Sequence, residues 1–162
     1  MLIKVEFASF AMDPDKNTPL IVLKETNGTR MLPLPVGPLE ASVIAIKTLD
    51  VPMEKPLTID LAKCILDELH GTLVRVIIDV ENGAMLFARL EIVAQGKIRR
   101  INCRTCDAIA LALRCEAPLF VRETVFEAMV PAGNKTPPPE RENLRMSIAS
   151  LDTMEFGSYY PE

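Results

Sequence analysis

The stretch that decides the fold runs from residue 104 to residue 121, and its sequence is Arg104-Thr105-Cys106-Asp107-Ala108-Ile109-Ala110-Leu111-Ala112-Leu113-Arg114-Cys115-Glu116-Ala117-Pro118-Leu119-Phe120-Val121. Its first part places Ile109 and Leu113 on one helical face with alanines beside them, which predicts a helix over residues 104–114. Residues 118–121 are short and apolar, which predicts a strand. The stretch therefore indicates a domain in which helices pack on a sheet.

The opening third of the chain predicts an antiparallel meander. Residues 2–12, 19–24 and 30–34 each have the pattern of a strand. A turn cluster at residues 13–17 separates the first two, and Asn27-Gly28 is a strong hairpin signal between the second and the third.

Two helices and a second group of strands follow. Gly37-Pro38-Leu39-Glu40 begins a helix, since proline suits its first position. Thr58 is expected to be the N-cap of a second helix that ends near Leu69, with Gly71 just past its end. Strands are expected at 73–80, 84–94 and 97–103, and a short helix at 123–129. The fold class predicted is α+β, with a mixed and mainly antiparallel sheet and helices packed on it.

The tail changes in composition after residue 130. We predict an α+β domain over residues 1–130, a proline-rich linker over 131–142 and a C-terminal tail over 143–162. The tail is polar with scattered apolar residues at roughly helical spacing, and we expect it to dock on the domain or on a neighbour, the alternative being disorder.

Charge and hydropathy restrict the class of protein. The 162 residues carry a net charge of −4, so the chain lacks the global basic surplus of a general nucleic-acid binder, although a local basic patch is compatible with it. No segment reaches the roughly 20 apolar residues that cross a bilayer. The N-terminal residues alternate like a strand rather than a signal peptide, so we expect no membrane contact, a cytoplasmic location and four reduced cysteines.

Three stretches in this order resemble the bifunctional nuclease (BFN) domain family: residues 32–41, residues 55–61, and residues 104–114 with 117–121. The resemblance spans roughly residues 2–130. It implies an α+β fold with a mixed or antiparallel sheet, assembly into dimers or larger homo-oligomers, and, by the family's name, hydrolysis of DNA and RNA.

The chain departs from the family pattern at positions that bear on chemistry. Ile59 stands where many members have a histidine, and Thr105-Cys106 stand where many have Pro-Ser. These departures indicate a divergent branch that lacks one acid, base or metal ligand.

Three carboxylates are the candidate catalytic and metal-binding residues. Glu40, Asp60 and Asp107 each fall in the first turn of a predicted helix. Carboxylates there complement the helix dipole and satisfy free amides, which is one interpretation. The other is that the helix starts converge and the three carboxylates hold Mg²⁺ or Mn²⁺, as hydrolysis of a phosphodiester requires.

Arginines supply the candidate phosphate site. Arg99 and Arg100 precede the helix at 104–114, and Arg104 begins it. Guanidinium forks fit phosphate, and a helix N-terminus attracts anions. The alternative is a solvated basic edge paired with acids.

Cys103 and Cys106 form a C-x-x-C between a strand and a helix. This placement suggests thiol redox chemistry or half of a zinc site, against the alternative of two incidental small residues. With one histidine, His70, placed at a helix end, two-histidine nucleases and zincins are excluded.

Three hypotheses remain. The first is a metal-dependent nuclease that acts on nucleic acid through the three carboxylates and the arginines. The second is a non-catalytic homo-oligomeric binding or assembly module. The third and weaker one is a thiol redox protein.

Overall fold

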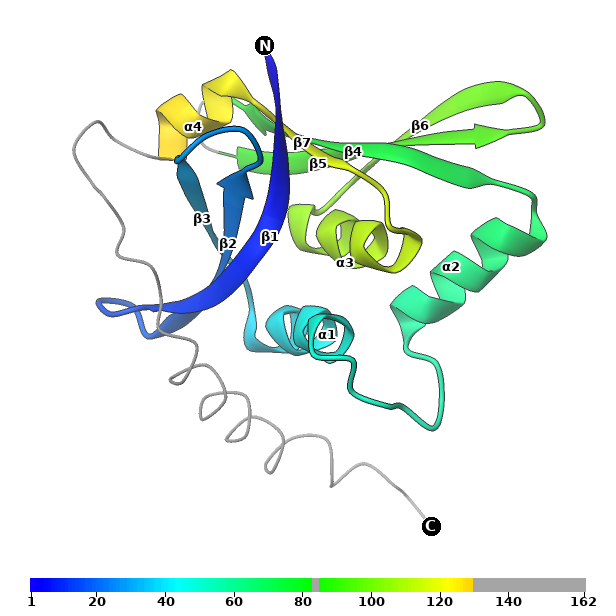
Figure 1. Cartoon of the computed structure of the whole chain (residues 1–162), viewed down its shortest axis with the longest axis horizontal. Coiled ribbons are helices and arrows are strands. Elements are labelled where there is room, and N and C mark those ends of the chain that lie inside the picture. The colour runs from blue at the N-terminus through cyan, green and yellow to red at the C-terminus, as the bar shows by residue number, and fades with distance from the viewer. Residues whose placement is uncertain (83–84, 130–162) are drawn as a thin grey trace.

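The computed structural model describes residues 1–82 and 85–129. Within them, seven strands form one sheet and four helices accompany it (Figure 1). The fold predicted from the sequence is therefore confirmed: it is α+β with a mixed, mostly antiparallel sheet. The linker predicted at 131–142 and the tail predicted at 143–162 lie outside the described residues.

The sheet consists of two antiparallel groups of strands joined through one short strand. The first group is β1 (Leu2–Asp13), β2 (Thr18–Glu25) and β3 (Met31–Pro35), and the second is β4 (Thr72–Glu81), β5 (Met85–Ala94) and β6 (Lys97–Cys103). Strand β7 (Leu119–Arg122) lies between β1 and β4, antiparallel to β1 and parallel to β4. The strand order is β3-β2-β1-β7-β4-β5-β6.

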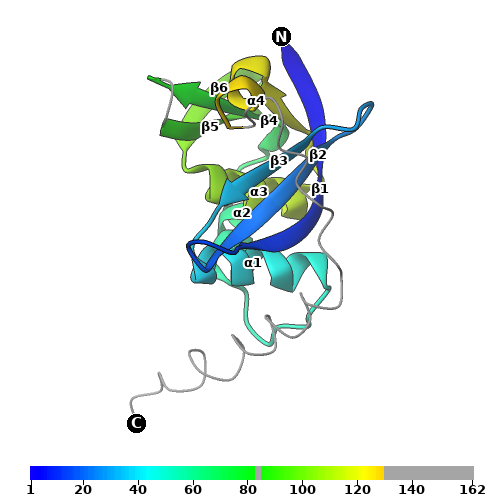
Figure 2. The ribbon, with the colours of Figure 1, turned by 90° about the vertical axis from the view of Figure 1, so that its left-hand side faces the viewer.

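Helix α3 (Thr105–Cys115) is the centre of the helical layer. It contacts α1 (Pro38–Thr48), α2 (Thr58–Glu68), β4 and β5. Five consecutive residues, 108–112, are buried, and three of them are alanines whose small side chains let the backbones of neighbouring elements approach closely. The strands curve around this layer when the molecule is viewed from the side (Figure 2). Helix α4 (Glu123–Met129) follows β7 and buries Val125 and Phe126 in the core.

Helix α2 differs from the sequence-based expectation at its N-cap. The helix begins at Thr58, so its N-cap is Leu57 rather than Thr58. The Asp60 carboxylate accepts a hydrogen bond from the Leu57 N–H at 2.8 Å and so satisfies the backbone donor of the N-cap residue. No residue of α2 is buried, and Leu61 and Ile65 are 52% and 50% exposed. Ile59 and Leu66 are partly buried against the core, whereas Leu61, Ile65 and Leu69 are exposed.

The end of α2 also differs in detail. The residue in the left-handed region is His70, with φ 53°, whereas Gly71 has no positive φ. A Cβ at Gly71 would lie 2.4 Å from Cδ1 of Leu66 and 3.2 Å from the Leu66 carbonyl oxygen, so a larger residue here would require the Leu66 side chain to move. The helix does end before Gly71, as predicted, but the left-handed residue that ends it is His70.

Candidate active site

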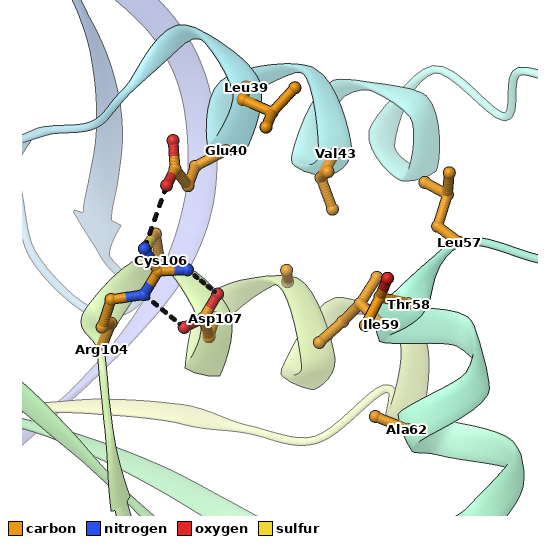
Figure 3. Close-up of a pocket in the computed structure, with 11 residues that line it drawn as sticks. Leu39, Glu40, Val43, Leu57, Thr58, Ile59, Ala62, Arg104, Cys106 and Asp107 are labelled. Carbon is orange, nitrogen blue, oxygen red and sulfur yellow. Dashed lines mark hydrogen bonds and ion pairs between the residues drawn. The ribbon is translucent and has the colours of Figure 1, made fainter. Parts of the chain in front are cut away.

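A pocket of about 570 Å³ opens where α1, α2 and α3 meet. Most of its lining is apolar, and the charged side chains gather at one side (Figure 3). Leu39 and Val43 come from α1, Ile59 and Ala62 from α2, and Ala110 from α3. The enclosure depends on three helices packing side by side, and a cavity of this size suits a small organic group.

Arg104 joins two carboxylates at the rim of this pocket. Its Nε and Nη2 donate to Oδ2 and Oδ1 of Asp107 at 2.7 and 3.0 Å, and its Nη1 donates to Oε1 of Glu40 at 3.1 Å (Figure 3). Arg104 is the N-cap of α3, so Asp107 lies one turn further along the same helix. Glu40 comes from the first turn of α1. Acids from the first turns of α1 and α3, which are far apart in the sequence, therefore bind the same guanidinium group.

The cluster is accessible and carries one net negative charge. The Arg104 side chain is 66% exposed, and that of Asp107 is 43% exposed. The hydrogen bonds and charge of Asp107 raise the pKa of Arg104 above its ordinary value, so the guanidinium stays charged. Because it is exposed, Arg104 can exchange one partner for another anion at small cost.

Gly37 makes room for the Glu40 carboxylate. Its φ of −70° and ψ of 157° are open to any residue, so backbone freedom does not explain a glycine here. A Cβ at this position would lie 2.3 Å from Oε2 of Glu40. The glycine thus allows the carboxylate to lie against the chain before α1.

A second, smaller cavity of about 210 Å³ lies on another side of Arg104. Thr105 lines it, and the Thr105 hydroxyl is buried without a hydrogen-bond partner among the described residues. A buried hydroxyl without a partner is costly, and such groups commonly bind water or a ligand. The first residues of α3 therefore offer an unused polar group beside the charged cluster.

Asp60 is held elsewhere. Its carboxylate accepts hydrogen bonds from Arg114, whose side chain is only 4% exposed, and from the Leu57 N–H. Burial alone would raise the pKa of Asp60, but these hydrogen bonds outweigh it and lower the pKa below its ordinary value. Arg114 also donates to the carbonyl oxygens of Ala110 at 3.1 Å and Val43 at 3.2 Å. Asp60 therefore takes part in a link between the three helices.

The three predicted carboxylates are consequently not brought to one point. Glu40 and Asp107 meet at Arg104, whereas Asp60 is bound to Arg114. Among residues 1–82 and 85–129, no three His, Cys, Asp or Glu side chains form a group that could hold a metal ion. Binding of Mg²⁺ or Mn²⁺ by the remaining pair stays a prediction.

The three predicted phosphate-binding arginines are divided as well. Arg100 donates to Glu91 at 3.0 Å, on the sheet face opposite the helices. Arg99, the residue before Arg100, lies on the other face of β6, since neighbouring residues of a strand point to opposite sides. Arg104 alone of the three lies at the pocket.

The cysteines of the C-x-x-C are free thiols in partly buried positions. Burial raises the pKa of Cys103 to about 11, with the charge of Asp107 adding to the effect, and burial also raises the pKa of Cys106. A reactive cysteine needs a lowered pKa, because the thiolate is the nucleophile. The local environment therefore works against redox chemistry at these two residues.

The pocket walls were not foreseen from the sequence. Leu39 and Val43 of α1, and Ala62 of α2, are apolar residues in helices. In the sequence such residues predict packing in a core and give no sign that they line a cavity. Two positions gave a signal. Ile59 and Cys106, at which the chain departs from the pattern of the family it resembles, both line the pocket.

No helix in the part of the chain that the structure describes is long and apolar enough to cross a membrane.

Comparison with known proteins identifies the family. The model of the bifunctional nuclease domain matches residues 21–131, which includes the pocket and its charged rim. Uncharacterized proteins from two strains of Mycobacterium tuberculosis, CDC 1551 / Oshkosh and ATCC 25618 / H37Rv, are each 27% identical over 157 residues, which is 96% of this chain and 92% of theirs. The match covers more than half of the chain and carries the three resembling stretches in order, so the chain belongs to the bifunctional nuclease domain family.

Proposed function

We propose that this chain hydrolyses phosphodiester bonds of single-stranded nucleic acid at the rim of the pocket between α1, α2 and α3. The observation that carries the proposal is the meeting of Glu40, Asp107 and Arg104 beside a cavity large enough for a nucleotide base. A carboxylate can accept the proton of the attacking water, and an exposed arginine can hold the phosphate. The family's name supports the same activity.

The phosphate would bind at the start of α3. Arg104 offers a guanidinium fork, and the helix N-terminus adds partial positive charge. The Thr105 hydroxyl is buried at the smaller cavity on another side of Arg104, so it would donate to the phosphate only when the start of α3 opens around it. The adjoining base would enter the larger pocket and pack against Val43 and Ile59. Since duplex bases are stacked and paired, this arrangement favours a single strand or an extruded nucleotide.

The carboxylates would act on the attacking water. When Arg104 turns from Asp107 and Glu40 to the phosphate, both acids become free to orient water and accept its proton. Two carboxylates at one point match the set by which Mg²⁺ is commonly held together with substrate phosphates. A divalent cation bound there would supply Lewis acidity and offset phosphate charge. Because Ile59 replaces the family's frequent histidine, proton transfer falls to these acids.

Cleavage of labelled single-stranded DNA and RNA by highly purified protein, with Mg²⁺ or Mn²⁺, tests the proposal. We expect Asp107→Asn to lower the rate by at least about 100-fold while the far-ultraviolet circular dichroism spectrum is unchanged. The matched control is Asp15→Asn, a change of the same kind in the exposed turn between β1 and β2. Absence of cleavage by the unchanged protein with every metal and substrate would refute the proposal.

A second candidate function is assembly of identical chains through α2. Leu61, Ile65 and Leu69 recur every four residues along this helix and are at least half exposed. Such a stripe is usually covered by a partner. A homo-oligomer would bury it on both copies at once.

Light scattering distinguishes this candidate. Ile65→Glu would place a charge in the stripe and is expected to reduce the mass to that of one chain. Met12→Glu changes an exposed apolar residue on β1 and is expected to leave the mass unchanged. A single-chain mass for the unchanged protein at micromolar concentration would exclude assembly as its function.

A further inference from the structure

A cluster of arginines lies on the sheet face opposite α2 and α3. Arg75 on β4 is opposite Glu91 on β5, and Glu91 is opposite Arg100 on β6, so their side chains share one face. Arg89 precedes Glu91 by two residues on β5 and points the same way. Leu90 and Ile92 alternate with these residues along β5 and are buried in the core, so the arginines point away from it. Figure 1 shows α2 and α3 together on one side of β4 and β5. We call Arg75, Arg89 and Arg100 the arginine face.

The arginine face has more positive charge than its acids neutralise. The Glu91 side chain, 9% exposed, accepts from Nε of Arg75 at 2.6 Å and from Nε of Arg100 at 3.0 Å. One carboxylate thus serves two guanidinium groups. Nε of Arg89 donates to Oδ1 of Asn102 at 3.4 Å, and among the described residues no carboxylate pairs with it. The cluster therefore has two positive charges in excess.

An aromatic ring lies within the same surface. Phe87 precedes Arg89 by two residues on β5, so it faces the same side, and it is only half-buried. The guanidinium carbon of Arg89 is 6.0 Å from the centroid of the Phe87 ring. Flat groups of this kind are platforms on which unpaired bases stack, and arginine adds a cation–π contribution.

We propose that the arginine face binds single-stranded nucleic acid, with phosphates on Arg75, Arg89 and Arg100 and a base stacked near Phe87. Guanidinium groups held at fixed positions on a sheet match the spaced charges of a phosphate backbone. An acidic protein segment would bind the positive charge of the arginines but has no flat base to stack on Phe87, so nucleic acid matches the surface better. The surface lies across the sheet from the helices that form the pocket, so the inference does not rest on cleavage there.

Fluorescence anisotropy with a labelled single-stranded oligonucleotide in EDTA tests the inference, because removal of divalent cations separates binding from metal-dependent cleavage. The variant R89Q/R100Q keeps the Arg75–Glu91 pair, so the buried carboxylate retains a partner. We expect its affinity to fall at least about fivefold, and the slope of log affinity against log salt to fall by about 1.4, since each phosphate contact to a single strand contributes about 0.7.

The charge-matched control is K16Q/K24Q, which removes two positive charges from exposed positions near β2. It is expected to bind within about twofold of the unchanged protein, as exposed charges remote from the strand are screened. Equal losses in both variants would overturn the inference, and so would equally tight binding of a poly-aspartate peptide. Cleavage by R89Q/R100Q is measured separately with Mg²⁺ or Mn²⁺, so loss of cleavage and loss of binding remain separate results.

Discussion

At the residue scale, the polar side chains near the pocket differ in how their hydrogen bonds are satisfied. Asp60 accepts one hydrogen bond on each carboxylate oxygen, from the buried Arg114 and from a backbone N–H, and is thereby held in the link between the helices. Arg104, Glu40 and Asp107 satisfy one another at an exposed position, where partners exchange cheaply. The Thr105 hydroxyl is buried with no partner among the described residues. Exposed pairs and an unused hydroxyl, rather than the buried pair, mark the reactive region.

Thr105→Val gives a prediction that separates function from stability. Valine has the shape of threonine but no hydroxyl, and removing a buried hydroxyl without a partner should leave the free energy of unfolding unchanged or raise it by up to about 1 kcal/mol. If that hydroxyl binds the phosphate, the cleavage rate at low substrate concentration should fall about tenfold. Urea unfolding and cleavage kinetics measure the two quantities. A variant that loses stability and keeps its rate would show a structural role only.

Thiol reactivity is a second prediction at this scale. Cys64 is exposed, whereas burial raises the pKa of Cys103 to about 11 and also raises the pKa of Cys106 and Cys115. At pH 8, a disulfide reagent such as DTNB should therefore titrate one thiol rapidly and the others slowly in the folded protein. Cys64→Ser should abolish the fast phase. A fast phase that persists and maps to Cys103 or Cys106 would revive the redox hypothesis.

At the scale of elements, α2 is attached to the rest of the fold by two partly buried side chains, Ile59 and Leu66, and by one ion pair. It buries none of its residues, and the buried Arg114 on α3 connects it through Asp60 while also reaching the Val43 carbonyl of α1. Ile59 and Ala62 of this helix form one wall of the pocket. The Arg114 link therefore controls both the position of α2 and the shape of the cavity.

Arg114→Met should be strongly destabilising. Methionine replaces the buried stem but removes the Arg114 donor from the Val43 carbonyl and the charged partner from Asp60, so we expect the free energy of unfolding to fall by about 2–4 kcal/mol. The comparison variant is Arg99→Met, which removes an exposed arginine with no ion pair among the described residues and should cost less than about 1 kcal/mol. Urea denaturation followed by circular dichroism gives both values. Similar losses would show that Arg114 is no more important than a surface arginine.

The same link predicts a pH dependence with a definite sign. The folded-state pKa of Asp60 lies below its ordinary value, so the carboxylate stabilises the fold fully above about pH 4 and loses this contribution as the pH falls through the folded-state pKa. The difference in unfolding free energy between the unchanged protein and Asp60→Asn should therefore be largest at pH 5–7 and shrink below about pH 4. A difference that grows on acidification would contradict the assignment.

At the scale of the whole molecule, local patterns in the sequence predicted most elements, since hairpin glycines, helix starts and strand alternation are local. The position of β7 was different. This short strand inserts between β1 and β4 and unites two meanders, and pairing across such sequence distances leaves no local trace. The separation of Asp60 from the other acids could not be predicted for the same reason. It results from the contact with Arg114, which lies 54 positions from Asp60 in the sequence.

The candidate site was predictable in part. Glu40, Asp107 and Arg104 were found because acids and arginines at helix starts are visible in the sequence, and the structure brings these three together. The pocket beside them arises from the packing of three helices, and the arginine face arises from register in β4, β5 and β6. Both depend on contacts between distant segments, so composition, with its net charge of −4, gave no sign of either.

The most direct test of the central claim is the cleavage rate of Glu40→Gln, Asp107→Asn and the double variant on a labelled single-stranded RNA with Mn²⁺. If the two acids serve one site, each single change lowers the rate by at least about 100-fold, and the double variant is no more than about threefold slower than the worse single variant, since groups that act as a unit are not additive. Single variants that cleave at the rate of the unchanged protein would contradict the claim that the pocket rim is where the phosphodiester is cleaved.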